Sequence, residues 1–396
     1  MLSLVATALL ALRLVPIVSG HSAIFHPSMF GFNVTDKTFP YDNRPVAPLR
    51  SMTFQQWWFH NHLDHPPNPG DFFELPAGKP ATAEIACNKG ATSYFASADG
   101  GDIRDPNNPN NVCPGSPTQT YHTNGIDDLK GCGLAIAYKS DAKQVQPEDF
   151  TIFSVNQTCV WTRFTDFQVP AKMPPCPDGG CTCAFFWVHS PKAGGEENYM
   201  NGFKCNVTGS TSTVPVAKSQ VPRRCGADTD NQKLQSAPGN CTYGAKQPFY
   251  WFNLERNNMF EGAFSPPVYN DLYNFLDGAQ DDIFEDSYDS IPNPSPIAPV
   301  PTLRSANSQR SNSTMETATV DNPIAESDTA ANSTMPKARE VARTCGRRAT
   351  GDSSSSFAAR SLDGRWAQNA KRSVVGMRMR SRRLTARDRN RLWHMW

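Results

Sequence analysis

The chain has 396 residues, 38% of them apolar and 19% charged, and its 38 basic and 37 acidic side chains give a formal net charge of +1. The charge is unevenly distributed, because residues 337–396 carry 16 basic and 4 acidic side chains, a net charge of +12, whereas residues 21–336 carry a net charge of −12. The acidic body is long enough to bury a full core, and we expect neither nucleic acid nor a membrane as a partner.

Residues 1–20 are predicted to be a secretory signal peptide. Leu2 to Val18 form a short apolar stretch, and Val18, Ser19 and Gly20 supply small residues at the cleavage point. The stretch is too short, and too interrupted by Arg13, for a transmembrane anchor. We therefore expect a secreted, extracellular protein whose mature chain begins at His21.

An N-terminal histidine offers two nitrogen donors on one residue, the α-amine and the imidazole. The amine titrates near neutrality, so a metal displaces its proton at modest cost. A second histidine would add a third nitrogen, and three nitrogens in one plane suit Cu(II). The alternative is chance: with 8 His in the chain, a given position is His about once in fifty.

The body is predicted to be all-β, an immunoglobulin-like or fibronectin-like antiparallel β-sandwich with long loops and several disulfides. Short apolar or aromatic runs bounded by Gly, Pro, Asn and Asp mark the expected strands, with one short helix over Met52–His62. The expected strands are Ala83–Cys87, Leu134–Tyr138, Phe150–Val155, Cys159–Phe167 and Cys183–His189. The aromatic-rich stretch Met259–Phe275 is expected to pack back on the body.

Ten of the eleven cysteines lie between Cys87 and Cys241, and an even number in an exported chain predicts up to five disulfides of unknown pairing. The alternative is a zinc site at Cys176, Cys181 and Cys183. Cys345 is the odd cysteine. Six glycosylation sequons also suit a secreted glycoprotein, at Asn33, Asn156, Asn206, Asn240, Asn312 and Asn332.

After Tyr288 the chain becomes rich in Pro, Ser, Thr and Ala and then in Arg, which predicts a disordered tail. The expected organisation is a signal peptide over residues 1–20, a catalytic domain over 21–288 and the tail over 289–396.

Five further histidines of the body are candidates for the third nitrogen: His60, His62, His65, His122 and His189. His60 and His65 lie among apolar residues, where a histidine is more often structural. His122 lies in a polar loop just before the predicted strand at Gly131–Cys132, where a loop ligand at the edge of a sandwich would be.

Four segments resemble auxiliary-activity family 14 of the lytic polysaccharide monooxygenases, which are fungal copper enzymes linked to xylan. They are HSAIFHPSMFGFNVT, FQQWWFHNHLDHPP, YHTNGIDDLKGC and ENYMNGFKCNVTGSTS. The resemblance implies a copper held by His21 and His122, with Tyr199 near the axial position. It also implies that His189 supports the site from outside the set of metal ligands. Glu197 stands where related enzymes have Gln, although an ionised Glu accepts hydrogen bonds and cannot donate them.

The resemblance further implies a monomer with one copper per chain, which cleaves xylan or xylan-coated cellulose oxidatively. The reaction would require an external electron donor and O₂ or H₂O₂. Four aromatic residues could dock the polymer or fill the core: Trp57, Trp58, Tyr94 and Phe95. Two alternatives stay open: a secreted copper-binding protein without catalysis, and a carbohydrate-binding protein in which His21 is incidental.

Overall fold

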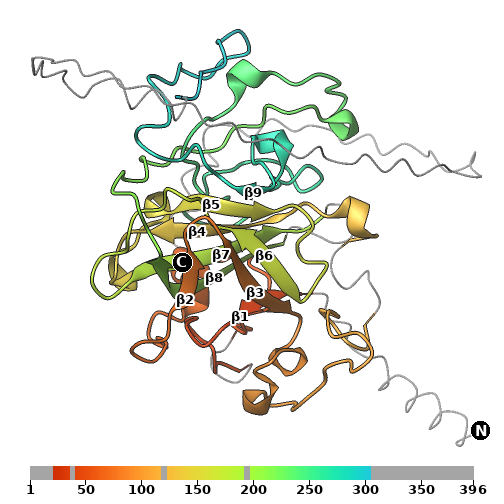
Figure 1. Ribbon diagram of the computed structural model, residues 1–396. Coiled ribbons are helices and arrows are strands. Elements are labelled where there is room, and N and C mark those ends of the chain that lie inside the picture. Colours follow the sequence, from red (N-terminus) through yellow and green to blue (C-terminus); the bar gives the residue numbers. More distant parts are fainter. Residues whose placement is uncertain (1–20, 36–40, 117–122, 191–196, 305–396) are drawn as a thin grey trace, which may run out of the picture. The chain divides into compact units, whose positions relative to one another are not determined.

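The computed structural model describes residues 21–35, 41–116, 123–190 and 197–304. The chain divides into two units, residues 1–315 and 316–396, and all of the described residues belong to the first. This unit is a β-sandwich (Figure 1). Among the described residues, no helix is long and apolar enough to cross a membrane.

The smaller sheet has the strand order β1-β3-β6, and all of its strands are antiparallel. The larger sheet has the order β2-β8-β7-β4-β5-β9 and is antiparallel except for the pair β2–β8. The strands are β1 Ala23–Phe25, β2 Phe73–Pro76, β3 Pro80–Ala86, β4 Cys132–Ala137, β5 Thr151–Asn156, β6 Phe164–Gln168, β7 Cys181–Val188, β8 Asn198–Thr208 and β9 Gly278–Ala279.

In the described parts of the chain, helical structure is confined to short turns in the loops. The α-helix α2 spans Phe54–Trp57 and continues into the 3-10 turn η1 over Trp58–Asn61. The other 3-10 turns are η2 Lys89–Ala91, η3 Phe95–Ser97, η5 Ile126–Asp128, η6 Ala142–Gln144, η7 Pro147–Asp149, η8 Thr229–Asn231, η9 Pro238–Asn240 and η10 Asp271–Tyr273.

The register brings four residues of the larger sheet into one row at one end. Tyr199 of β8 pairs with Trp187 of β7, which pairs with Cys132 of β4, which pairs with Asn156 of β5. We call this end of the sheet the Tyr199 edge. Because neighbouring strands lie about 4.8 Å apart, the row is about 14 Å long.

Both faces of the larger sheet are covered, and every residue of β7 is accordingly buried. One face packs against the smaller sheet and includes Tyr199, Trp187 and Phe203. The other face, with Met200 and Phe186, is covered by aromatic residues of α2, η1 and residues 249–275. The prediction that Met259–Phe275 packs on the body is therefore confirmed.

The ten clustered cysteines form five disulfides: Cys87–Cys113, Cys132–Cys159, Cys176–Cys181, Cys183–Cys205 and Cys225–Cys241. The alternative of a zinc site is therefore wrong, since its three cysteines are bonded in two different disulfides. Cys345 lies outside the described residues.

All five predicted strands are present, with ends shifted by a few residues. In the predicted strand Cys159–Phe167, only the part from Phe164 is extended in the sheet, because the chain first turns after the Cys132–Cys159 disulfide. The predicted helix over Met52–His62 is shorter than expected and ends in a kink. Four of the described strands were not predicted: β1, β2, β9 and β8, which is the longest.

Residues 289–304 pack on the body, although the sequence analysis assigns them to the tail. The Arg304 amide donates to the Ser287 carbonyl at 2.9 Å and the Ser295 amide donates to the Gly239 carbonyl, both in the body, while the Arg304 side chain pairs with Asp289 within the segment. The Pro-rich composition of this segment suits an extended strap as well as a disordered chain, so composition alone misplaces the boundary. The rest of the predicted tail lies outside the described residues.

Candidate functional site

His21, Glu197 and Tyr199 come together at the Tyr199 edge, between the two sheets. His21 immediately precedes the first strand of the smaller sheet, and Tyr199 is the second residue of β8. The Nε2 atom of His21 lies 3.6 Å from Oε2 of Glu197. The hydroxyl of Tyr199 donates to the same carboxylate oxygen at 3.2 Å, and the His21 and Tyr199 rings lie 6.1 Å apart.

Tyr199 is held rigidly. Its ring stacks on Trp187 with centroids 4.4 Å apart and an interplanar angle of 23°, and only 1% of the residue is exposed. Burial raises the pKa of the Tyr199 hydroxyl well above its ordinary value, and the negative charge of Glu197 raises it further. The hydroxyl is therefore protonated in the described protein, and Glu197 orients it.

His189 follows the last residue of β7 and is 2% exposed. Its Nδ1 atom lies 2.7 Å from the Ser190 carbonyl oxygen. A carbonyl can only accept, so Nδ1 donates the hydrogen in this contact. Val188 pairs with Asn198, so His189 lies at the same edge of the sheet as Tyr199.

His122 lies outside the described residues, and the structure does not test it as a ligand. The chain that follows it is anchored: Thr123 is fully buried, and its hydroxyl donates to the Gly125 carbonyl at 2.5 Å. The amide of Asn124 donates to Asp128.

His60 and His62 are buried structural residues, with 2% and 1% exposed, and their rings stack with centroids 5.7 Å apart. Burial lowers the pKa of His60 to about 4 and that of His62 to about 3. Phe59, His60 and Asn61 have positive φ angles of 52°, 53° and 59°. The packing of the Phe59 ring on Gly202 stabilises this turn, since a Cβ at Gly202 would lie 2.0 Å from the ring.

Trp57 and Trp58 belong to the core, with 1% and 4% exposed, so their docking role is not supported. Tyr94 and Phe95 are half-buried; Tyr94 packs against His26, and the guanidinium of Arg104 lies 4.0 Å over the Phe95 ring.

Sequence reasoning missed two aromatic residues that are almost fully exposed, Phe260 and Phe264. Nothing in their aromatic-rich surroundings distinguishes them from core residues.

The donor set at His21 fits a copper ion. Within the described ranges, no group of three or more His, Cys, Asp or Glu side chains is arranged to hold a metal. The site at the Tyr199 edge is of another kind, because it offers one imidazole and one phenol. Cleavage after Gly20 would add an α-amine. Imidazole and amine nitrogens with a weaker oxygen ligand suit tetragonal copper.

Comparisons with known proteins agree over most of the chain. The family model of lytic polysaccharide monooxygenase AA14 matches residues 2–389. A protein of Trametes coccinea (strain BRFM310) named AA14 family lytic polysaccharide monooxygenase B is 68% identical over 290 residues, which cover 72% of this chain and 69% of that protein. The protein of the same name from Pycnoporus cinnabarinus is 60% identical over 345 residues, 84% of this chain and 91% of that protein. The chain therefore belongs to the AA14 family of lytic polysaccharide monooxygenases, and it is an oxidoreductase of a generally copper-dependent family that acts on polysaccharides.

Proposed function

We propose that this chain is secreted, loses residues 1–20, and binds one copper ion at the mature N-terminus to cleave xylan or xylan-coated cellulose oxidatively. The observation that carries the proposal is the convergence of His21, Glu197 and Tyr199 at one edge of the sandwich. The five disulfides suit an oxidising, extracellular compartment.

In this proposal the α-amine and ring of His21 and the ring of His122 would hold the metal, and the Tyr199 hydroxyl would be the neighbouring oxygen donor. Bound copper supplies the one-electron chemistry with O₂ or H₂O₂ that an unactivated C–H bond requires, after reduction by an external donor. The protein holds the site rigid, since Tyr199 is fixed by the Trp187 stack and by Glu197.

In this proposal Glu197 contributes to the site as a hydrogen-bond acceptor. Its carboxylate receives the Tyr199 hydroxyl and faces the His21 ring, so it orients both groups. The position cannot supply the amide donor of related enzymes while Glu197 is ionised. His189 lies at the same edge of the sheet. We assign to Glu197 and His189 together the support of the site from outside the set of metal ligands.

The catalytic domain comprises residues 21–304 in this proposal, because the strap over residues 289–304 is bonded to the body. Residues 305–396 are expected to be dispensable for copper binding. The choice of xylan rests on the resemblance of the sequence to xylan-linked enzymes, since the names of the relatives specify only polysaccharide.

The test is Cu(II) binding to the mature protein, followed by electron paramagnetic resonance and calorimetry. The wild type is expected to bind one Cu(II) per chain. His122→Ala should abolish tight binding and change the spectrum, whereas His65→Ala, which removes an exposed histidine, should change neither. An unchanged spectrum in His122→Ala contradicts the assignment of the second ligand.

Activity is tested separately on xylan-coated cellulose with reductant and O₂ or H₂O₂. Oxidised oligosaccharides are expected. If the protein binds copper but releases only unoxidised products, or none, the xylan-directed activity is refuted and a copper-binding protein without this catalysis remains.

A further inference from the structure

Residues 251–270, which we call the edge segment, run along the Tyr199 edge of the larger sheet. At one end, the side-chain amide of Asn198 donates to the Trp251 carbonyl at 2.7 Å. Asn198 lies between Glu197 and Tyr199 in the sequence, so this end of the edge segment lies at the same end of β8 as the candidate copper site, on the opposite face of the sheet. At the other end, the Tyr269 amide donates to the carbonyl of Lys130, which lies just before β4. The edge segment therefore passes from the β8 end of the row to its β4 end.

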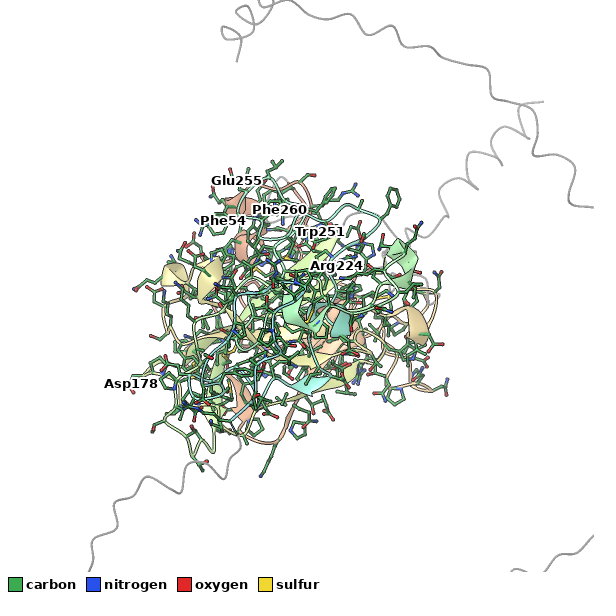
Figure 2. All side chains as sticks on the ribbon, turned by 90° about the horizontal axis from the view of Figure 1, so that it is seen from above. Phe54, Asp178, Arg224, Trp251, Glu255 and Phe260 are labelled. Atoms are coloured by element: carbon green, nitrogen blue, oxygen red, sulfur yellow. A yellow bond between two sulfur atoms is a disulfide. The ribbon has the colours of Figure 1, made fainter. Side chains whose placement is uncertain are left out.

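A chain of hydrogen bonds fixes the middle of the edge segment. The indole of Trp251 donates to the Glu261 carbonyl at 2.8 Å. The Glu261 carboxylate accepts from the Tyr273 hydroxyl at 2.6 Å, and that hydroxyl accepts from Arg224 at 3.1 Å. Figure 2 shows Trp251, Glu255, Phe260 and Phe54 labelled near one margin of the molecule, while Asp178 lies well away from them.

Two phenylalanines project from this fixed segment into solvent. Phe260 is 84% exposed and Phe264 is 92% exposed. Large aromatic side chains that stay exposed on a rigid segment indicate an interaction surface, because their burial in the core would otherwise stabilise the fold.

Phe264 also lines a polar cavity of about 320 Å³, together with Lys130, Gln157, Asn231 and Asp271. Arg224 builds one wall: its guanidinium pairs with Asp228 and donates to the Ser265 carbonyl at 2.8 Å. Asn231 donates to the Ser265 hydroxyl at 3.1 Å. Gln157 follows Asn156, the last residue of the row, so the cavity lies about 14 Å from Tyr199 along the edge.

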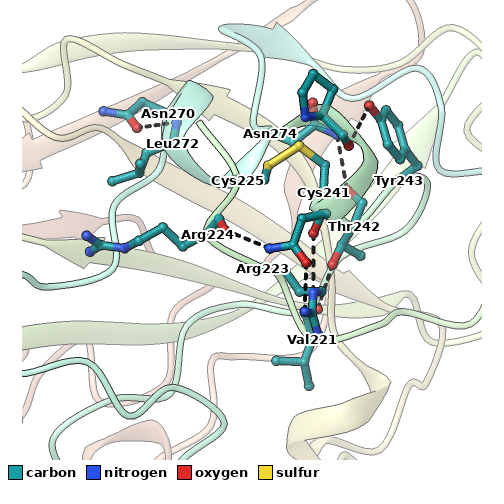
Figure 3. The surroundings of a disulfide bond; sticks show 12 residues. Val221, Arg223, Arg224, Cys225, Cys241, Thr242, Tyr243, Asn270, Leu272 and Asn274 are labelled. Carbon is teal, nitrogen blue, oxygen red and sulfur yellow. Dashed lines mark hydrogen bonds between the residues drawn. A yellow bond between two sulfur atoms is a disulfide. The ribbon is translucent and has the colours of Figure 1, made fainter. Parts of the chain in front are cut away.

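A disulfide fixes this wall of the cavity. Cys225, the neighbour of Arg224, is bonded to Cys241, and its amide donates to the Leu272 carbonyl at 2.9 Å (Figure 3). The Asn240 side chain donates to the Arg224 carbonyl at 3.2 Å. The cavity is therefore preformed and does not need to be assembled by a ligand.

We infer that the edge segment is the polysaccharide-binding surface of this enzyme, with Phe260 and Phe264 as stacking platforms and the Arg224 cavity as a saccharide subsite. The ligand is a strand of neutral sugar residues. Pyranose rings present apolar C–H faces to aromatic rings and hydroxyls to amides and carboxylates, which are the two kinds of group found here. The cavity and the candidate copper site lie at the same end of the larger sheet, beside the two ends of the row from Asn156 to Tyr199, so a bound strand would reach from the cavity toward His21. The inference rests on the proposed function for the position of the reacting sugar.

The test measures binding of metal-free protein to insoluble xylan, xylan-coated cellulose and cellulose by depletion from solution. Phe260→Ala/Phe264→Ala should weaken binding to at least one of these polymers about tenfold. The matched control is Ile297→Ala, because Ile297 is 94% exposed but belongs to the strap over residues 289–304. Melting temperature and the Cu(II) spectrum should be unchanged in both variants.

Three outcomes overturn the inference: equal binding by the double variant and the wild type, no polymer binding by the wild type, or a wild-type dimer that becomes monomeric in the double variant. Because binding is measured without metal, these outcomes are independent of the copper site. Failure of the proposed function would appear instead as a wild-type protein that does not bind Cu(II), with its binding to the polymers unaffected.

Discussion

His60 and His62 are expected to make the stability of the folded body depend strongly on pH. Burial lowers their folded-state pKa to about 4 and about 3, whereas an unfolded histidine titrates near 6.5. As the pH falls below 6.5, these two histidines bind protons in the unfolded chain but stay neutral in the folded chain until the pH is much lower. The stability that these residues contribute is therefore complete above pH 6.5 and is lost as the solution is acidified.

The size of the effect follows from the two pKa differences. Between pH 7 and pH 5, each histidine should remove about 2 kcal/mol from the free energy of unfolding, or about 4 kcal/mol together. This is a large part of the stability of an ordinary domain, which is about 5–15 kcal/mol.

The assay is urea unfolding at pH 7, 6 and 5 with the disulfides intact, followed by tryptophan fluorescence. His62→Gln should reduce the dependence of the unfolding free energy on pH by about 2 kcal/mol over this range, even if it lowers stability at every pH. His60→Gln is the second variant, and the exposed His65→Gln should change the dependence less than either, because the charge of His65 is a smaller cause of the lowered pKa of His62 than burial is. The same pH dependence in His62→Gln as in wild type would refute the reasoning, because it would mean that this histidine is protonated in the folded protein.

Three further predictions concern packing and boundaries. Arg163→Met should lower stability by about 3–5 kcal/mol, measured by urea unfolding, because it leaves the buried Glu84 carboxylate with hydrogen bonds from Ser93 but without an opposite charge; both side chains of the pair are under a tenth exposed. Asn198→Ala should lower the free energy of unfolding by about 2 kcal/mol through the loss of two buried hydrogen bonds. It should also weaken polysaccharide binding without changing copper stoichiometry, and unchanged polysaccharide binding would show that Asn198 does not position the edge segment. Truncation after Arg304 should leave melting temperature and Cu(II) affinity unchanged, whereas truncation after Tyr288 should lower the melting temperature; equal melting temperatures would show that the strap contributes nothing.

A buried strand can be predicted from the sequence only where its buried positions carry apolar residues. β7 was predicted because Cys181–Val188 is almost entirely apolar. β8 was missed because Asn198, Asn201 and Gly202 interrupt its apolar pattern. The structure explains each exception: the two amides donate to backbone carbonyls, and Gly202 leaves space for the Phe59 ring. These partners are distant in the sequence, so the pattern of β8 itself could not reveal them.

The candidate site shows the same limit. The metal-binding potential of His21 could be derived from its position after a cleavage point, but nothing local places it beside Glu197 and Tyr199, more than 170 residues away. Those two residues were reached through resemblance to a family. The stretch Met259–Phe275 was predicted to pack on the body, which is correct for Met259 and Tyr269. The exposure of Phe260 and Phe264 depends on the bonds that Glu261 makes to Trp251 and Tyr273, and no sequence pattern records them.

The central claim is that the α-amine of His21 is a copper ligand. The most direct measurement is the Cu(II) paramagnetic resonance spectrum of the mature protein, compared with that of a form carrying one additional glycine before His21. The added residue turns the His21 nitrogen into a peptide amide while leaving the folded body intact. The account predicts a changed spectrum and much weaker binding in the extended form. Identical spectra and affinities would contradict it, because the metal would then be held without the N-terminal amine.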